Sequence, residues 1–359
     1  MNDQPASPHA LIIGAGPAGL ATALCLARRG VGYTLLERGP SVLTSLRRID
    51  PEMELLSPMR LSRLPGMPMP PGLPTYPTFP ALTDALNDYA EQQAVRATTN
   101  ADVVSVEGRQ NDFTVRFRDA EGVMQTARGS HVISATGLIS APKLPDNFDP
   151  EACAFPWLHS IDAHTEPIKK ARRLLVVGGG TSAAEVLERW LDVRRADDRA
   201  WLSLRSPLLA FWHWPLGIDI HYLAWLPEHL TARVLPWQAG RFREPMLGWK
   251  VPRALKRGVI TRLPAIRCYQ DAHVTPVDGE PLQPDLVVFA TGFRYATDHL
   301  NGLLDYDSGG RPRVRACEST RTPGLYLMGF RYGRSLASPY LRGIARDAAY
   351  VARRIARKK

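Results

Sequence analysis

Two glycine-rich segments, each directly after a run of apolar residues, are the parts of the chain best suited to hold a phosphate group. Residues 11–19 read LIIGAGPAG, and residues 174–183 read LLVVGGGTSA. Glycines between a buried strand and a helix let the backbone approach a pyrophosphate, which then lies at the positive end of the helix. Two such segments predict two dinucleotides held face to face, the arrangement that passes a hydride from a nicotinamide to a flavin.

The first segment has the surroundings that a dinucleotide site requires. Gly14 allows the sharp turn after the strand, Gly16 lets the pyrophosphate approach, and Gly19 lets the helix pack closely. Pro17 suits a first helical turn, where its missing N–H leaves no bond unmade. Glu37 ends the next apolar run, 23 residues after Gly14, near the spacing of about 20 for the acid that binds a ribose hydroxyl. A chance glycine turn would not carry these flanking signals.

The second segment differs at the position that selects the nucleotide. The run after its helix, residues 200–204, ends in Arg205 and not in an acid. A guanidinium pairs with a 2′-phosphate that a carboxylate would repel, so Arg205 favours NADPH over NADH. The alternative is a surface arginine at the end of a strand.

Composition narrows the classes of partner. The chain has 359 residues and a net charge of +10, but the charge is spread along it without a nucleic-acid-binding motif, so no nucleic-acid partner is expected. The apolar stretch 11–27 is too short and too rich in glycine for a membrane span, and the N-terminus does not resemble a signal peptide. Four scattered cysteines without a C-x-x-C pair indicate the reducing cytoplasm and no metal site.

The order of elements predicts an α/β fold with two Rossmann-like three-layer dinucleotide-binding domains, the second inserted in the first. Residues 1–150 and 291–359 are expected to form the FAD-binding domain, which includes a small antiparallel β-meander over 103–128. Residues 151–290 are expected to form the NADPH-binding domain. The sequence A-T-G follows an apolar strand twice, at 135–137 and 290–292, which fits strands that return the chain between two nucleotide-binding domains.

Three further segments lie outside these motifs. Residues 64–80 are rich in proline, and we expect an ordered surface loop there, with a polyproline ligand for a partner as the alternative. A helix should follow, with Thr83 as its N-cap. The insertion 211–251 is rich in tryptophan and forms either a cap over the second domain or part of a substrate pocket. Its tryptophans are Trp212, Trp214, Trp225, Trp237 and Trp249.

In their order along the chain, these motifs resemble those of the two-dinucleotide-binding flavoproteins, and most of all the class B flavin-dependent monooxygenases, which include flavin-containing, YUCCA-type and related bacterial enzymes. The motifs are G-x-G-x-x-G, Glu37, A-T-G, G-G-G-x-S-A, A-T-G-F and a terminal PGLYLMGF at 323–330. Disulfide reductases of this superfamily usually carry Gly-Asp where this chain has Gly329-Phe330, together with a redox cysteine pair. The resemblance therefore favours a monooxygenase.

The resemblance implies FAD and NADPH as cofactors and molecular oxygen and a small organic molecule as substrates. NADPH would reduce the flavin, and a C4a-hydroperoxyflavin would deliver oxygen to an amine, a thioether or an enolised carbon. The expected cofactor contacts are Gly14, Gly16, Pro17, Ala18, Gly19, Glu37, Arg38, Val103, Ala135, Thr136, Gly137, Gly178, Gly180, Thr181, Ser182, Arg205, Ala290, Thr291, Gly292, Gly329 and Phe330.

The chain departs from the family pattern in two places that concern oxygenation. Of the fingerprint F-x-G-x-x-x-H only His159 matches, and Ser57 replaces the asparagine that many members place near the flavin. Ser57 and His159 are the candidates for shaping the oxygen-reacting site, although each could be an ordinary hydrogen-bonded residue. The histidines His213, His221 and His229 are assigned no metal.

The alternatives to a monooxygenase are a flavin dehydrogenase or oxidase, a disulfide reductase on the same fold, and a nucleotide-binding sensor without catalysis. A homodimer is a further possibility.

Overall fold

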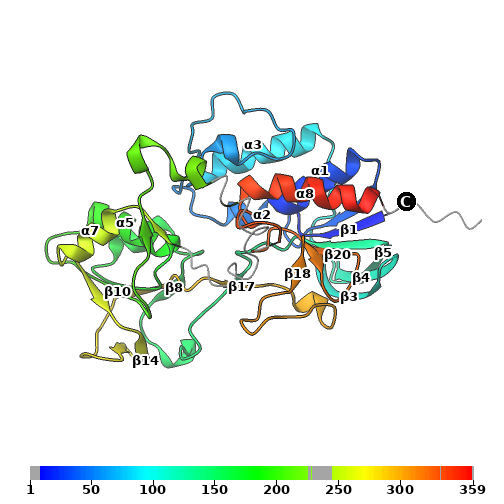
Figure 1. The fold of residues 1–359 in the computed structure, drawn as a ribbon. Coiled ribbons are helices and arrows are strands. Elements are labelled where there is room, and N and C mark those ends of the chain that lie inside the picture. The colour runs from blue at the N-terminus through cyan, green and yellow to red at the C-terminus, as the bar shows by residue number, and fades with distance from the viewer. Residues whose placement is uncertain (1–8, 225–227, 229–244, 332, 358–359) are drawn as a thin grey trace, which may run out of the picture.

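The computed structural model describes residues 9–224, 228, 245–331 and 333–357. These residues form two lobes, each built around a β-sheet (Figure 1). The first sheet has the strand order β18 (Val314–Arg315), β19 (Glu318–Ser319), β20 (Leu325–Leu327), β6 (His131–Ser134), β1 (His9–Ile13) and β2 (Gly32–Leu36). The strands β20, β6, β1 and β2 are parallel, and β19 and β18 add an antiparallel edge.

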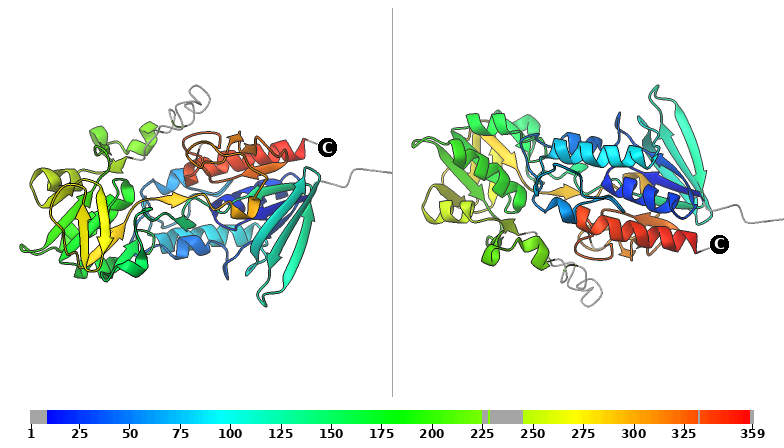
Figure 2. Two further views of the ribbon diagram at one scale, coloured as in Figure 1. Left: turned by 90° about the horizontal axis from the view of Figure 1, so that it is seen from below. Right: turned by 90° about the horizontal axis from the view of Figure 1, so that it is seen from above.

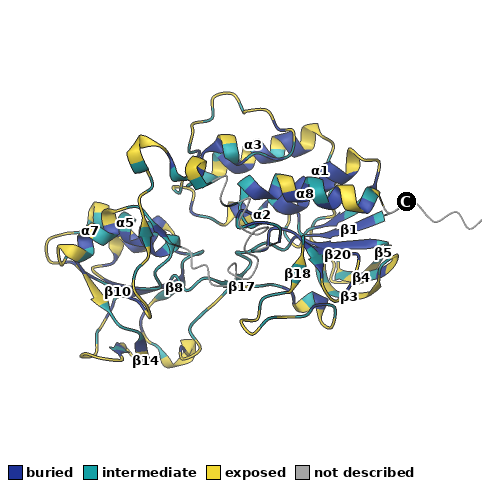
Figure 3. Cartoon of the chain, in the orientation of Figure 1, coloured by how far each residue is buried: buried dark blue, intermediate teal, exposed yellow. Residues whose placement is uncertain are grey.

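Both faces of the first sheet are covered, because successive side chains of a strand point to opposite faces. Ala10 and Ile12 of β1 pack among helices α1 (Pro17–Ala27), α3 (Phe79–Gln92) and α8 (Leu341–Ala356). Leu11 and Ile13 pack against the antiparallel meander β3 (Asp102–Arg109), β4 (Asp112–Arg118) and β5 (Met124–Gly129). Figure 2 shows α8 and the meander on different sides of the sheet, and Figure 3 shows the central strands buried.

The second sheet is entirely parallel. Along the chain, its strands come after β6 and before β18 of the first sheet. Its order is β13 (Ile260–Leu263), β10 (Arg199–Ser203), β9 (Arg173–Val177), β16 (Leu286–Phe289) and β8 (Trp157–His159). Helices α4 (Thr165–Lys170), α5 (Thr181–Val193) and α7 (Lys250–Lys256) supply one core with this sheet. The hairpin β14 (Ile266–Gln270) and β15 (His273–Pro276) supplies the core on the other face.

The two segments that connect the lobes pair with each other. The short strand β7 (Ala141–Pro142) is antiparallel to β17 (Phe293–Arg294). Within the insertion, β11 (Ala210–Phe211) pairs with β12 (Met246–Leu247). The remaining short elements are α2 (Thr44–Arg47) and the 3-10 helices Met59–Leu61, Pro150–Ala152, Pro215–Gly217 and Asp298–Leu300.

The predicted α/β fold with two Rossmann-type sheets and a small meander is confirmed. The chain leaves the first sheet after β6 and rejoins it at β18 to β20, while the domain boundaries at 150 and 291 stay predictions. The prediction for Thr83 is wrong. The helix α3 begins earlier, after Thr78, and the Thr83 hydroxyl donates to the Phe79 carbonyl inside it at 2.7 Å. No helix in the described ranges is long and apolar enough to cross a membrane.

Candidate dinucleotide and active site

Two cavities open beside the glycine-rich turns. The larger has a volume of about 1150 Å³ and is lined by residues of both lobes, and the smaller has about 510 Å³ and lies at the second turn. Sites for a single drug-sized ligand usually span about 300–1,000 Å³. The larger cavity therefore exceeds the volume that one drug-sized ligand needs.

Three glycines of the first turn serve two different needs. A Cβ atom on Gly14, whose φ is +97°, would lie 2.7 Å from the Ala135 carbonyl oxygen, and one on Gly19 would lie 1.9 Å from the Gly14 carbonyl oxygen. Gly14 must be glycine so that the turn can lie against the end of β6, and Gly19 must be glycine so that α1 can pack against the turn. A Cβ on Gly16 would meet nothing closer than the Ser45 hydroxyl at 3.8 Å. Gly16 faces the larger cavity, and its bare backbone fits the close approach of a pyrophosphate.

The Glu37 carboxylate is fixed at the edge of the same cavity. It accepts hydrogen bonds from the backbone N–H groups of Ala15, at 2.7 Å, and Gly39, at 2.8 Å. An ionised carboxylate offers about four lone-pair sites, so two hydrogen bonds leave capacity for the hydroxyls of a ribose. The geometry fits the adenosine end of FAD.

The second turn lies between the two cavities. Gly178 has φ +124°, and a Cβ there would lie 2.1 Å from the Ala290 carbonyl oxygen, whereas a Cβ on Gly180 would meet nothing within 4 Å. Gly178 and Gly180 line the smaller cavity, and Thr181 and Ser182 in the first turn of α5 line the larger one. A dinucleotide lying across this helix start would reach both cavities.

The structure divides the predicted contacts into three groups. Those lining the larger cavity are Ser57, Gly14, Gly16, Pro17, Ala18, Glu37, Arg38, Val103, Ala135, Thr136, Gly137, Thr181, Ser182 and Gly329. Those lining the smaller cavity are Gly178, Gly180, Arg205, Ala290 and Thr291. Outside the lining of both are Gly19, His159, Gly292 and Phe330.

The two candidates for the oxygen-reacting site have different surroundings. The Ser57 hydroxyl lies 2.9 Å from the Ser62 hydroxyl at the cavity wall. His159 is buried, and its Nε2 donates to the Gly292 carbonyl at 2.9 Å, so the side chain ties the end of β8 to the connection between the lobes. Burial lowers the pKa of His159. Phe330 is likewise buried and stacks on Tyr295.

Another histidine, His299, lines the larger cavity without having been predicted there. Burial lowers its pKa to about 4, so the imidazole is neutral at physiological pH. Its Nε2 lies 3.3 Å from the Ser134 hydroxyl at the end of β6.

The insertion contributes to the larger cavity through side chains other than its tryptophans. Trp212, Trp214 and Trp249 are exposed and line neither cavity. Trp225, Trp237 and His229 lie outside the described residues. The cavity lining from the insertion is Phe211, Ile220, His221, Ala224, Glu228, Pro245 and Leu247.

Sequence patterns missed a polar cluster at this end of the cavity, formed by Tyr76, His213, Asp219 and His221. Ligand-type atoms of His213, Asp219 and His221 lie within 4.8 Å of one another. The one local signal is the spacing of Asp219 and His221, with the aspartate directly before a helical segment that starts at residue 220.

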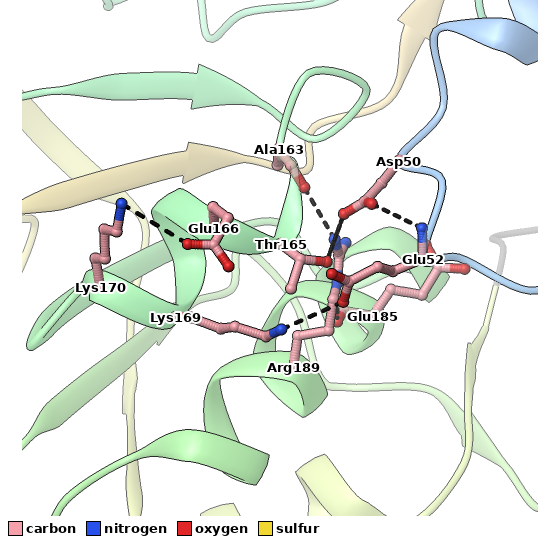
Figure 4. Close-up of polar contacts among 9 residues, drawn as sticks. All are labelled: Asp50, Glu52, Ala163, Thr165, Glu166, Lys169, Lys170, Glu185 and Arg189. Atoms are coloured by element: carbon pink, nitrogen blue, oxygen red, sulfur yellow. Dashed lines mark hydrogen bonds and ion pairs between the residues drawn. The ribbon is translucent and has the colours of Figure 1, made fainter.

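A largely buried ion pair joins the lobes (Figure 4). Arg189 of α5 donates to Asp50 at 2.8 Å and to the Ala163 carbonyl at 3.0 Å, and the Thr165 hydroxyl donates to Asp50 at 2.5 Å. Burial raises the pKa of Asp50, but hydrogen bonds from Thr165 and from the Glu52 N–H, with the charge of Arg189, hold it below its usual value. An ionised carboxylate therefore fixes α5 against the loop after α2.

Comparison with known proteins assigns the family. A model of the pyridine nucleotide-disulphide oxidoreductase family matches residues 11–193, which is just over half of the chain. The chain belongs to this family. It is 32% identical to indole-3-pyruvate monooxygenase YUCCA6 of Arabidopsis thaliana, over 94% of this chain and 89% of the relative. It is 27% identical to the probable indole-3-pyruvate monooxygenase YUCCA9 of the same plant, over 95% and 89%.

The solved structures agree with the family assignment. A flavin-containing monooxygenase from Stenotrophomonas maltophilia superposes with a TM-score of 0.77 at 25% identity, and the match covers 98% of both chains. The protein is therefore a class B flavin-dependent monooxygenase-like member of the family. The resemblance stated from its motifs is confirmed.

Gly16→Val should remove FAD binding with little effect on folding. The new side chain has room in the protein, at a cost of about 1 kcal/mol or less for a poor N-cap, but it occupies the path of the pyrophosphate. We expect the purified variant to be colourless and its apoprotein melting temperature to stay near that of the wild-type apoprotein. Gly180→Val is the matched control, because it should retain FAD and bind NADPH more weakly. A yellow Gly16→Val protein would contradict the role given to the first turn.

Arg189→Met should destabilise the protein by about 3–5 kcal/mol, because it leaves the Asp50 charge buried without its cation. The measurement is urea unfolding at neutral pH. Lys169→Met is the control, since it removes the exposed Lys169–Glu52 ion pair (3.3 Å) between the same lobes, which should contribute about 1 kcal/mol or less. Similar small losses in both variants would show that the Asp50–Arg189 pair does not stabilise the contact between lobes.

Proposed function

We propose that the protein is an FAD- and NADPH-dependent monooxygenase that acts on a small organic substrate with molecular oxygen. One observation carries the proposal. A single cavity extends from the first glycine turn and Glu37 to Thr181 and Ser182 at the start of α5. Two dinucleotides held at these two turns would bring their reactive rings into the same cavity.

Each lobe is proposed to hold one cofactor. Residues 1–150 and 291–359 would hold FAD, with the pyrophosphate at Gly16 and the N-terminus of α1 and with a ribose on Glu37. Residues 151–290 would hold NADPH, with its phosphates at Gly180 and the N-terminus of α5. When bound, the nicotinamide supplies a hydride and the flavin passes the electrons to oxygen.

The chain itself contributes position, charge and the exclusion of water. Apolar side chains from both lobes line the larger cavity, including Leu55, Leu56, Phe79 and Leu247. Such walls keep bulk water from a reactive site and strengthen the electrostatic interactions inside it. Ser57 is proposed to contact the reacting end of the flavin, because it is the hydroxyl in this wall that replaces the family asparagine.

A flavin dehydrogenase or oxidase would use the same cavity, and it remains the alternative for the second half of the reaction. Thiol–disulfide exchange is less well supported. Cys25, Cys153, Cys268 and Cys317 are all free thiols outside the lining of both cavities. Burial raises the pKa values of Cys25, Cys153 and Cys317, which disfavours the reactive thiolate.

The cytoplasm is the proposed location, because four free thiols suit a reducing compartment. A homodimer stays a prediction, which the mass of the holoenzyme in solution would test.

The reaction is tested with the FAD-loaded protein in two stages. Mixed with NADPH without oxygen, the protein should lose the visible absorbance of its flavin. When ¹⁸O₂ is then admitted with candidate substrates, one labelled oxygen atom should enter the product and one should enter water. Flavin reduction followed only by stoichiometric hydrogen peroxide, with every candidate substrate, would favour the oxidase. No flavin reduction by NADPH would refute the proposal.

Arg205→Ala should weaken NADPH binding and leave NADH binding nearly unchanged. The exposed Arg205 lines the smaller cavity, where loss of a charge-assisted contact to the 2′-phosphate should raise the Kd for NADPH about 10- to 100-fold. The measurement is calorimetric titration of both nucleotides into the holoenzyme. Arg262→Ala, which removes an exposed arginine of β13 outside the cavity linings, is the control. Equal losses for NADPH and NADH would refute the role of Arg205.

A further inference from the structure

The insertion reaches the first lobe through the buried Asp219. Its carboxylate caps the helical segment at residue 220 by accepting the His221 backbone N–H at 2.7 Å, an ordinary N-cap contact. It also accepts the hydroxyl of Tyr76, which belongs to the proline-rich loop of the first lobe. The Nε2 of His213 lies 3.5 Å from the same carboxylate. Asp219 is thus surrounded by donors on both oxygens.

These contacts keep Asp219 ionised. Burial alone raises its pKa, but the hydrogen bonds from Tyr76 and His221 more than compensate, so the pKa lies below its ordinary value. The carboxylate can then only accept. Because the Nδ1 of His221 lies 2.8 Å from Asp219 Oδ1, the proton of a neutral His221 ring must be on Nδ1.

The other ring nitrogen of His221 is left for a ligand. His221 lines the larger cavity, and its Nε2 makes no hydrogen bond within the described part of the chain. Burial and the nearby Arg342 cation lower the pKa of His221, although Asp219 acts in the opposite direction. The ring is therefore neutral at physiological pH, with a free lone pair on Nε2.

The charged and hydrogen-bonding groups around His221 come from three parts of the chain. Asp219 and His213 belong to the insertion, Tyr76 to the proline-rich loop, and Arg342 to α8. Arg342 is itself paired with Glu228 of the insertion, with contacts of 2.7 and 2.5 Å. A contact that served only to hold the insertion in place would account for Asp219 and Tyr76, but it does not require an imidazole in the cavity wall.

We propose that His221 is the catalytic base that removes a proton from the reacting atom of the substrate, and that Asp219 is its positioning residue. The inference rests on the proposed function. In this step the X–H bond of the substrate breaks, the proton binds Nε2, and the electron pair stays on X. The lone pair of X can then form a bond to one atom of O₂, while the O–O bond breaks and the other atom leaves as water with the two electrons that NADPH would supply through the flavin. The imidazolium that forms is stabilised by Asp219, and its proton returns to water when the product leaves. An aspartate that orients a histidine base in this way is a recurrent catalytic arrangement.

The proposal also selects a class of substrate. A base is needed only where the reacting atom of the bound substrate carries a proton in place of a free lone pair. Among the three nucleophiles named above, this describes a protonated amine and the C–H group of an enolisable carbon, whereas a thioether has free lone pairs at every pH. We therefore assign the site to a substrate whose reacting atom must lose a proton, and an amine serves as its probe.

The test compares benzylamine with thioanisole as probes of the FAD-loaded enzyme. In His221→Gln, the ratio of kcat/KM for benzylamine to that for thioanisole should fall about 100-fold, as expected for loss of a general base. In Asp219→Asn the ratio should fall about 10-fold. His164→Gln, which changes an exposed histidine outside the cavities, should keep the wild-type ratio. Equal losses for both probes, or no loss for the amine, would overturn the proposal.

The pH profile distinguishes a base from a merely structural residue. For the wild-type enzyme, kcat/KM for benzylamine should rise as His221 loses its proton, at a pH below the usual 6.5 of histidine, and then level off. In His221→Gln it should stay low until benzylamine itself loses its proton above neutral pH. The same profile in both proteins would overturn the proposal.

A measurement without turnover separates this proposal from the proposed function. In the ¹⁵N-histidine spectrum of the holoenzyme at pH 7.5, assigned by comparison with His221→Gln, His221 should be neutral and carry its proton on Nδ1. A proton on Nε2, or a charged ring, would overturn the base whatever the enzyme oxidises. If the flavin is reduced by NADPH but neither probe is oxygenated, the position of the His221 proton in this spectrum decides whether the residue can act as the base. If NADPH does not reduce the flavin at all, the proposed function fails.

Discussion

The site depends on the contact that fixes one lobe against the other. The two glycine turns belong to separate sheets, and they form one cavity only while α5 stays against the loop that follows α2. Arg189, Asp50 and Thr165 hold this position with short hydrogen bonds in a buried setting. Buried charges are costly to leave unpaired, so displacement of either lobe exposes or isolates a charge. The electrostatics of this small cluster therefore helps to hold the two cofactor sites in place relative to each other.

The sequence was sufficient where function depends on neighbouring residues along the chain. Gly16 and Gly19 have their roles within a single strand, turn and helix, so the spacing of the glycines alone predicts the turn, although the close approach of Gly14 to Ala135 joins distant segments. Glu37 follows because the next parallel strand must lie beside the first. The uninterrupted apolar residues of β1 also predict that both its faces are covered, but not that helices cover one face and the meander the other.

Residues that come from distant segments could not be grouped in advance. Tyr76 and Asp219 are 143 positions apart, and no periodicity relates a proline-rich loop to a tryptophan-rich insertion. His159 matches a motif position, but such a position does not tell where the side chain points. In the structure its imidazole donates to the Gly292 carbonyl. The tryptophan content of the insertion correctly indicated a segment that contributes to the cavity. The described tryptophans themselves are exposed, and other side chains of the insertion line the cavity.

The pairing of β7 with β17 has a mechanical consequence. Two covalent connections join the lobes, and because they are hydrogen-bonded to each other they must bend together. Any change in the angle between the lobes must therefore bend both connections at this pairing. Such a change would also have to break the contacts that the insertion makes with Tyr76 and Arg342 of the first lobe, or carry them along.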